Sequence, residues 1–425
     1  MHLSTAACLA LLAAPAAAQH HWIDPNGGSF HDSGNWSTGV VPGYWGEVNF
    51  DLLGSTAYSV SFTSPVHLAD ALVRVGSVDF DLGGNELQLE QSYRPLLVLD
   101  SSTTSWPTLT VRGGRVLVDG PVWVAYYPLF GNLQGSGVLI LDGPATALAP
   151  LYATGSGGDI QIGNGRNYPA VLEVSNGAIC SSGRVIISQG PSILRGDGGA
   201  IVQAADVRGL LSPGTAASAV GSLGFGSTLR LRPSSWTEID LEQAVPGGAD
   251  VIAVTDTALI EGNLRVRLGA GYVPVVGDQF RILTAGVVNG RFHIVEMPAS
   301  PVGTQWALEY LPDRVTLGLS PSLTVLTPVP GVAGQQNTIT VDQAMDGALI
   351  YLAWSAYLGT RTIPQFPGLF LDLGYPVSLA AYGLASGGSI AFVSNVPAAA
   401  GGRSYYLQAV EPQSYRTSEV LLHTF

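Results

Sequence analysis

The chain has 425 residues, of which 46% are hydrophobic and only 12% are charged, and it contains 54 Gly and 27 Pro. This hydrophobic content argues against a disordered chain, and the high Gly content is typical of short strands joined by many turns. The net charge is −13 and there is no Lys. Because such a chain has no basic patch to neutralise phosphates, we do not expect nucleic acid as a partner.

Residues 1–18 have the layout of a Sec-type signal peptide. An apolar run from Ala6 to Leu12 is followed by Pro15 and three alanines, as a signal sequence with a small-residue cleavage site requires. We therefore expect a secreted, extracellular or cell-surface protein. Removal of the signal would leave Cys180 as the only cysteine, which allows no internal disulfide. No later segment reaches the roughly 20 apolar residues that span a bilayer, so we expect no transmembrane segment.

Short alternating runs fill residues 51–215. They are rich in Val, Ile and Leu, are broken by Gly pairs, and recur at roughly 20–25 residues per pair of strands; examples are Leu109–Arg112, Gly137–Leu141, Val171–Val174 and Arg184–Ile187. This spacing favours a β-solenoid of about seven rungs, about 30 Å tall. A β-sandwich stays open as the alternative. The Trp-rich stretch before these runs is placed to cap the stack.

The later strands are longer. In Thr228–Arg232 and Asn263–Leu268, Leu and Val alternate with Arg, so we expect an antiparallel sheet whose arginines cover its outer face. About 100 further residues have the size and strand density of an immunoglobulin-like or fibronectin-like sandwich. The expected protein is all-β, in five parts: signal peptide 1–18, Trp-rich cap 19–50, β-solenoid 51–215, β-rich closing region 216–320 and C-terminal sandwich 321–425.

Two groups of motifs resemble bacterial secreted proteins that carry autotransporter-associated β-strand repeats. The opening pattern of that family is matched by Trp22, Gly28, Phe30, Asn35, Trp36, Gly39, Pro42 and Glu47–Phe50, and its closing unit by Gly209–Gly214, Asp250–Val254 and Gly277–Leu283. Glu47 replaces the usual Asp. The resemblance covers most of residues 20–300. It implies a right-handed parallel β-helix, export and a cell-surface or extracellular role, and it implies no catalytic residues.

The last zone resembles a C-terminal module of secreted proteins from planctomycete-type bacteria. The matching residues are Pro330, Gly331, Ala333, Gly334, Asn337, Gly359, Ile363, Pro364, Pro367, Gly368, Gln408, Ala409 and Arg416–Ser418. In that module a Cys precedes the second Pro-Gly and another precedes Arg-Thr-Ser. Here Phe366 and Tyr415 hold those positions. Our hypothesis is that the two rings pack against each other.

Asp79 and Asp81 are the best local candidates for chemistry. They lie two residues apart and therefore on one face of a strand, as the two carboxylates of a glycoside hydrolase could. With Glu86 they could instead supply oxygen ligands to Ca²⁺. We favour a third interpretation, in which both Asp residues are solvated positions of an alternating strand. We assign no catalytic residue, cofactor or metal, and no nucleophile elbow or metalloprotease motif occurs in the sequence.

Aromatic residues are the other candidates for binding. Trp123, Tyr126 and Tyr127 cluster before Pro128, and exposed rings would give apolar platforms on which sugars stack. We favour core packing between rungs for them. The sequence thus predicts a non-enzymatic surface or adhesion protein, with the solenoid as spacer, the sandwich as interaction module, and surface glycans or other surface proteins as partners. A carbohydrate-binding protein and a β-helix polysaccharide lyase or hydrolase are the alternatives.

Overall fold

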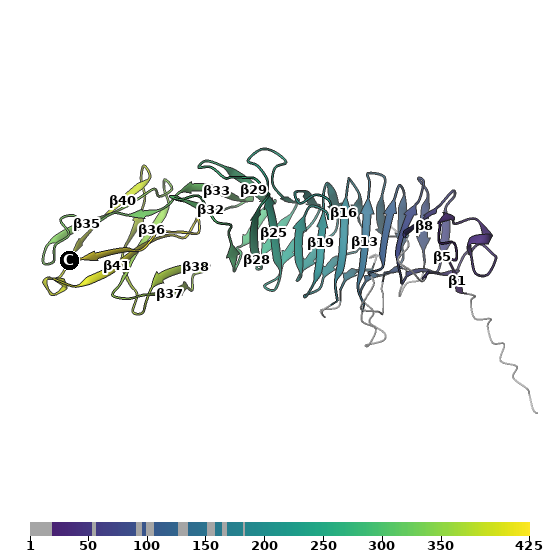
Figure 1. Ribbon diagram of the computed structural model, residues 1–425, viewed down its shortest axis with the longest axis horizontal. Helices are drawn as coiled ribbons and strands as arrows, with labels where there is room; N and C mark the ends of the chain where they lie inside the picture. The colour runs from purple at the N-terminus through teal and green to yellow at the C-terminus, as the bar shows by residue number, and fades with distance from the viewer. Residues whose placement is uncertain are drawn as a thin grey trace, which may run out of the picture.

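The computed structural model describes residues 19–52, 57–90, 96–98, 106–125, 135–150, 158–163, 168–181 and 183–425. These residues form an all-β protein, in which large parallel sheets are followed by antiparallel ones, and the sheets lie in series along one long axis (Figure 1). The described residues contain no α-helix. Two short 3₁₀ turns occur, at Ser33–Asn35 and Ala398–Ala400.

Three sheets of eleven strands build the solenoid. Sheet 1 contains β1 (Gln19–His21), β3 (Glu47–Phe50), β6 (Asp70–Val73), β9 (Leu96–Val98), β12 (Val122–Val124), β15 (Ile160–Ile162), β18 (Val185–Ile187), β21 (Ala205–Val207), β24 (Leu229–Leu231), β27 (Thr257–Ile260) and β30 (Val287–Gly290). Sheet 2 contains β2 (Gly28–Ser29), β4 (Ala57–Ser61), β7 (Ser77–Asp81), β10 (Thr108–Arg112), β13 (Gly137–Asp142), β16 (Ala170–Ser175), β19 (Ser192–Gly196), β22 (Leu210–Pro213), β25 (Trp236–Leu241), β28 (Asn263–Leu268) and β31 (Val295–Glu296). Sheet 3 contains β5 (Val66–Leu68), β8 (Glu86–Leu89), β11 (Arg115–Val118), β14 (Ala147–Pro150), β17 (Ile179–Cys180), β20 (Gly199–Ile201), β23 (Ser222–Phe225), β26 (Val251–Val254), β29 (Gln279–Thr284), β33 (Arg314–Pro321) and β32 (Thr304–Leu311).

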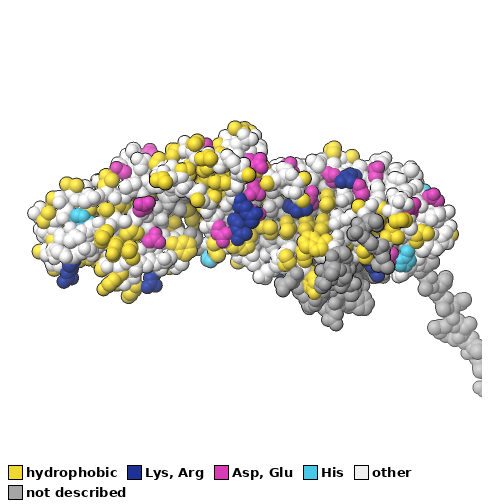
Figure 2. Space-filling view, viewed as in Figure 1, with side chains coloured by type: hydrophobic (Ala, Val, Ile, Leu, Met, Phe, Trp, Pro, Cys, Tyr) yellow, Lys and Arg dark blue, Asp and Glu magenta, His cyan; other side chains and the backbone are white. Residues whose placement is uncertain are grey.

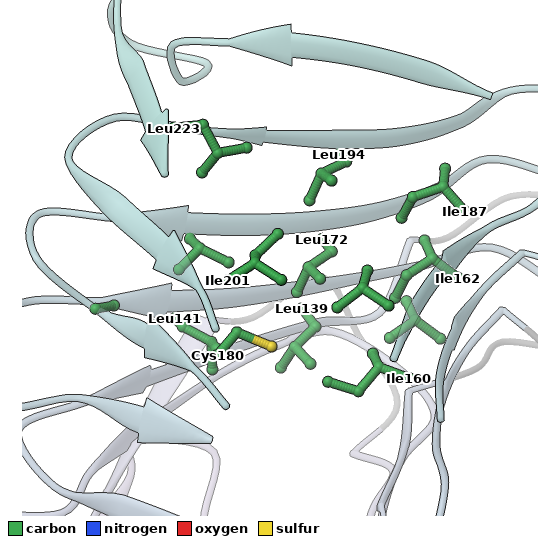
Figure 3. Close-up of a cluster of buried hydrophobic side chains, with 14 of the residues drawn as sticks. Leu139, Leu141, Ile160, Ile162, Leu172, Cys180, Ile187, Leu194, Ile201 and Leu223 are labelled. Atoms are coloured by element: carbon green, nitrogen blue, oxygen red, sulfur yellow. The ribbon is translucent and has the colours of Figure 1, made fainter. Parts of the chain in front are cut away.

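The core is made of aliphatic columns that run along the stack. Leu139, Leu172 and Leu194 occupy one register position on three successive rungs, and all three side chains are fully buried. Figure 3 shows them with residues of the other two sheets, such as Cys180 and Ile160, filling the interior. Because alternate side chains of a strand point to opposite faces, identical register places every inward residue above another inward residue. The core is therefore continuous along the solenoid.

Parallel stacking extends beyond residues 51–215. Sheet 2 has seven strands from β4 to β22, as expected, and four more outside that range. The strands β24–β27 and β25–β28 pair in parallel, which corrects our expectation of an antiparallel sheet there. The Arg alternation is equally compatible with a rung whose outer face is solvated. Among the described strands of these three sheets, only the pairs β29–β33 and β33–β32 are antiparallel, while β29 pairs in parallel with β26. Ten strand spacings of about 4.8 Å give a stack about 48 Å tall.

The N-terminal end is closed by aromatic packing. Trp22 and Trp36 are fully buried, with ring centroids 5.2 Å apart, and Phe30 packs 4.9 Å from Trp36. Trp45 is instead exposed. Because β1 and β3 pair within sheet 1, this Trp-rich stretch adds strands to the solenoid as well as covering it.

Three antiparallel layers follow. Sheet 4 contains β34 (Thr324–Val325), β35 (Gln336–Asp342) and β40 (Ser389–Asn395); sheet 5 contains β39 (Ser378–Leu384), β36 (Leu349–Ser355), β41 (Ser404–Glu411) and β42 (Arg416–Thr417), with β43 (Leu421–Thr424) paired to β41; the third layer is the hairpin of β37 (Leu358–Ile363) and β38 (Phe366–Leu373). Ile339, Ile350 and Leu407 belong to the core between sheets 4 and 5. Leu371 and Val410 belong to a smaller core under the hairpin. We call these layers the sandwich.

Hydrogen bonds connect the solenoid to the sandwich. The Leu308 N–H, on the last strand of sheet 3, donates to the Ser414 carbonyl at 2.9 Å, and the Gln305 side chain donates to the Thr417 carbonyl at 3.0 Å. The rings of Tyr310 and Tyr415 lie 5.7 Å apart. Across the described parts of the chain, no helix has the length and apolarity to cross a membrane.

Candidate interaction surfaces

Asp79 and Asp81 lie on the outer face of β7, where we expected them. Asp79 is ion-paired with Arg112 of the next rung, and Arg112 also binds Asp142 at 2.8 Å, one rung further. Burial raises the pKa of Asp79 despite Arg112. Burial also acts on Asp142, but the hydrogen bond from Asn176 at 2.7 Å and the contact with Arg112 outweigh it, so the pKa of Asp142 lies below its ordinary value. Arg112 thus bridges carboxylates from the two rungs on either side of its own.

The proposed calcium ligands are engaged elsewhere. Asp81 accepts the Gly83 N–H at 3.1 Å, and Glu86 pairs with Arg115 at 3.0 Å. Among the residues that the structure describes, no three His, Cys, Asp or Glu side chains converge as metal ligands would. The arrangement does not bring Asp79, Asp81 and Glu86 together around one point.

Pairing between rungs recurs along the outer face of sheet 2. Arg195 binds Glu173 at 2.7 Å, Arg267 binds Glu238 at 2.7 Å and Arg265 binds Glu296 at 2.6 Å. Figure 2 shows arginines beside acidic side chains at the middle of the molecule. Sequence reasoning considered the acidic residues alone and missed these partners, because each Arg lies about one rung away along the chain. Each of these ion pairs links two neighbouring strands of sheet 2 and so favours the register in which they are aligned.

Four hollows lined by described residues contain a single carboxylate among them. Glu309 lies in a hollow of about 660 Å³ near Arg281 and Arg314, while the hollows around His67, Trp354 and Gly224 contain none. A glycoside hydrolase requires two carboxylates across a cleft. None of these four hollows supplies that pair.

Of the three aromatic candidates in the solenoid, one can be placed. Trp123 lies on β12 and is only 7% exposed, between Val122 and Val124 of the core. It is therefore not an open platform for a ligand. Tyr126 and Tyr127 lie outside the described residues.

The sandwich carries a row of rings that sequence reasoning did not single out. Tyr351 and Tyr382 occupy facing positions on β36 and β39, with centroids 5.9 Å apart and planes at 28°, and Phe366 lies 6.5 Å from Tyr351. Tyr382 is 67% exposed. We call these three residues the ring row. Along β36 and along β39, successive side chains point to opposite faces of the sheet. This alternation is the sequence signal that could have placed Tyr351 and Tyr382 on one face.

The ring contact that we expected between Phe366 and Tyr415 is not formed. Phe366 packs on Tyr351, whereas Tyr415 packs on Tyr310 of the solenoid and lies beneath Arg291. Both side chains border the small core under the hairpin. The physical reason is that Tyr415 faces the junction with the solenoid, which the sequence alone could not reveal.

A second aromatic feature is a groove of about 390 Å³ between sheets 4 and 5. Trp354 and Tyr405 meet edge to face at 5.1 Å, and Phe425 lies 6.1 Å from Tyr405. Arg403 lines the same groove and forms no ion pair with a described carboxylate. The sandwich therefore combines exposed rings with an aromatic groove, whereas the described outer face of sheet 2 is ion-paired. No protein-family model matches this sequence, and no curated protein matches it.

Proposed function

We propose that this is an exported, non-enzymatic structural or adhesion protein of the cell surface or extracellular space. The solenoid acts as a spacer and the sandwich as the interaction module. The observation that carries the proposal is the difference between two surfaces: the described outer face of sheet 2 in the solenoid is ion-paired, while Tyr382, Tyr375 and Leu384 of the sandwich are at least two-thirds exposed. Large exposed apolar side chains gathered in one region are typical of binding surfaces.

The proposed family and location rest on the sequence resemblances. The Trp22-to-Phe50 opening supports membership in the secreted proteins with autotransporter-associated repeats, and the last 100 residues support the planctomycete-type module. Export is supported by the signal-like residues 1–18, which lie outside the described residues. Surface glycans or other surface proteins are the proposed partners.

Carbohydrate binding is the second candidate, and the ring row favours it. Tyr351 and Tyr382 are stacked with their planes at 28°, and Tyr382 is 67% exposed, so the free face of the Tyr382 ring could pack on a sugar. Polysaccharide cleavage has no comparable support, because the described hollows lack paired carboxylates.

The test measures binding of the intact mature chain to bacterial envelope material and to a glycan array. Tyr382→Ala should weaken binding at least about tenfold, as loss of a central exposed ring at an interface does. Tyr44→Ala is the matched control, because Tyr44 is a similarly exposed tyrosine on the solenoid. Equal binding by wild type and Tyr382→Ala, with loss in Tyr44→Ala, would contradict the proposal.

A further inference from the structure

Two consecutive strands of the sandwich have a partner on one side only. Among the described strands, β40 pairs only with β35, and β39 pairs only with β36. The turn at residues 385–388 joins β39 to β40 and the two strands contact each other, so both open edges lie at the same side of the sandwich. An open edge presents unpaired backbone N–H and C=O groups to any strand that approaches.

The chain covers end strands at both ends of its solenoid. Beside β1, the Ser37 N–H donates to the His21 carbonyl at 2.9 Å. Beside β30, the Val288 N–H donates to the Pro312 carbonyl at 2.7 Å. The last strand of sheet 3, β32, is covered by Ser414. At the start of β40 the turn bonds Ser386 to Ser389, but among the described residues no backbone hydrogen bond covers the outer edge of β40 beyond Ser389, or that of β39.

The edge of β40 also lacks the features that normally protect an edge. Residues 373–402 contain no charged side chain and no His. Strand β40 reads SIAFVSN, and all seven of its residues pair with β35 in unbroken register. The pairing of β39 is interrupted by a register shift opposite Leu352 and Ala353. Charges, prolines and bulges protect natural edges, and β40 has none of them.

We propose that β40 pairs with β40 of a second copy of this chain, in antiparallel orientation, so that sheet 4 continues across a two-fold axis. With a net charge of −13, two copies repel each other over most of their surface, but β39 and β40 themselves contain no charged residue. The uncharged edge offers no charged side chain with which a charged foreign strand could form an ion pair. Pairing identical edges makes a closed dimer instead of an open fibre. This proposal goes beyond the proposed function and does not depend on it.

The experiment is sedimentation of the intact mature chain over a concentration series. We expect twice the mass of one chain. Val393→Lys places a charge on an exposed, outward side chain of β40 and should raise the dimer dissociation constant at least about tenfold. The matched control Val302→Lys changes a fully exposed valine of the solenoid end and should leave the dimer intact. Ala391→Lys serves as a second edge variant should Val393→Lys unfold at lower temperature.

A wild-type chain that is monomeric at every concentration would overturn the proposal, as would edge variants that stay dimeric. Monomers that associate only when a foreign strand-forming peptide is added would also overturn it, in favour of a different partner. Glycan binding reports on the other proposal separately, because Val393 is not part of the ring row.

Discussion

Glu411 and Arg416 form an ion pair at 2.9 Å from which solvent is excluded, since their side chains are 0% and 1% exposed. The guanidinium of Arg416 also donates to the carbonyls of Gln343, at 2.8 Å, and Pro321, at 3.1 Å. Glu411 accepts the Met345 N–H at 2.8 Å. Pro321 is the last residue of β33, so this ion pair fixes the β41–β42 turn to the point where the two parts meet.

Loss of that cation should be among the most damaging single changes in the sandwich. Arg416→Met leaves the Glu411 carboxylate buried without its partner, and we expect a loss of about 3–5 kcal/mol in unfolding free energy. Chemical denaturation measures it. Arg361→Ala, at an exposed hairpin arginine, should cost less than about 1 kcal/mol. Similar costs for the two variants would contradict the role given to the pair.

The leucine columns of sheet 2 should behave as a rigid core. Leu172→Ala removes a fully buried side chain between Leu139 and Leu194, and the resulting cavity should cost about 2–5 kcal/mol. The exposed Val276→Ala is the control and should stay within about 0.5 kcal/mol of wild type. A small effect at Leu172 would mean that the rungs do not pack as described.

Cys180 should be unreactive until the solenoid opens. It is fully buried, and burial raises the pKa of its thiol to about 12, so the reactive thiolate is scarce at neutral pH. Labelling by a thiol reagent should be negligible in the native protein and complete in denaturant. Rapid native labelling would show that the wall of the solenoid admits solvent there.

Because of Asp250, the free energy of unfolding should fall as the pH rises. Asp250 is fully buried and accepts the N–H groups of Gly221, at 2.8 Å, and Asp240, at 2.9 Å. Burial raises its pKa to about 8 from the ordinary 3.8. The folded state therefore binds more protons than the unfolded state between these values, so stability is full below about pH 4 and is lost progressively up to about pH 8.

Thermal unfolding between pH 5 and pH 9 tests this at Asp250. The wild-type Tm should decline, and Asp250→Asn should decline less, whatever its absolute stability after losing one acceptor. The neighbouring acids Glu238 and Asp240, whose pKa values burial also raises, remain in both proteins. The difference between the two slopes therefore reports Asp250, and parallel slopes would refute its assigned titration.

Strand positions and stacking could be predicted from the sequence, whereas the extent and direction of pairing could not. Alternating apolar residues such as Leu139 and Leu141 identify an inward face. The run Asn263–Leu268 alternates in the same way, and alternation is compatible with either strand direction, so its parallel pairing became apparent only in the structure. The position of the Trp-rich stretch before the rungs predicted a cap, but not that β1 and β3 join sheet 1.

The candidate sites were less predictable. Asp79 does lie on an outer face, but Arg112, its partner, is 33 residues away in sequence and meets it only because rungs stack. The ring row depends on the register of β36 with β39. That register places Tyr351 opposite Tyr382, although the two residues are 31 positions apart along the chain. Contacts between distant residues are set by register, and a single sequence does not specify it.

The division of labour between spacer and interaction module can be tested most directly by shortening the solenoid by one rung. Residues 170–191 form one repeat, since Ala170 and Ser192 hold the same register position, and their removal should leave the stack closed. We predict that this shortened chain binds envelope material as tightly as wild type, while Tyr382→Ala in the full-length solenoid does not. Loss of binding in the shortened but folded chain, with binding retained by Tyr382→Ala, would contradict the account.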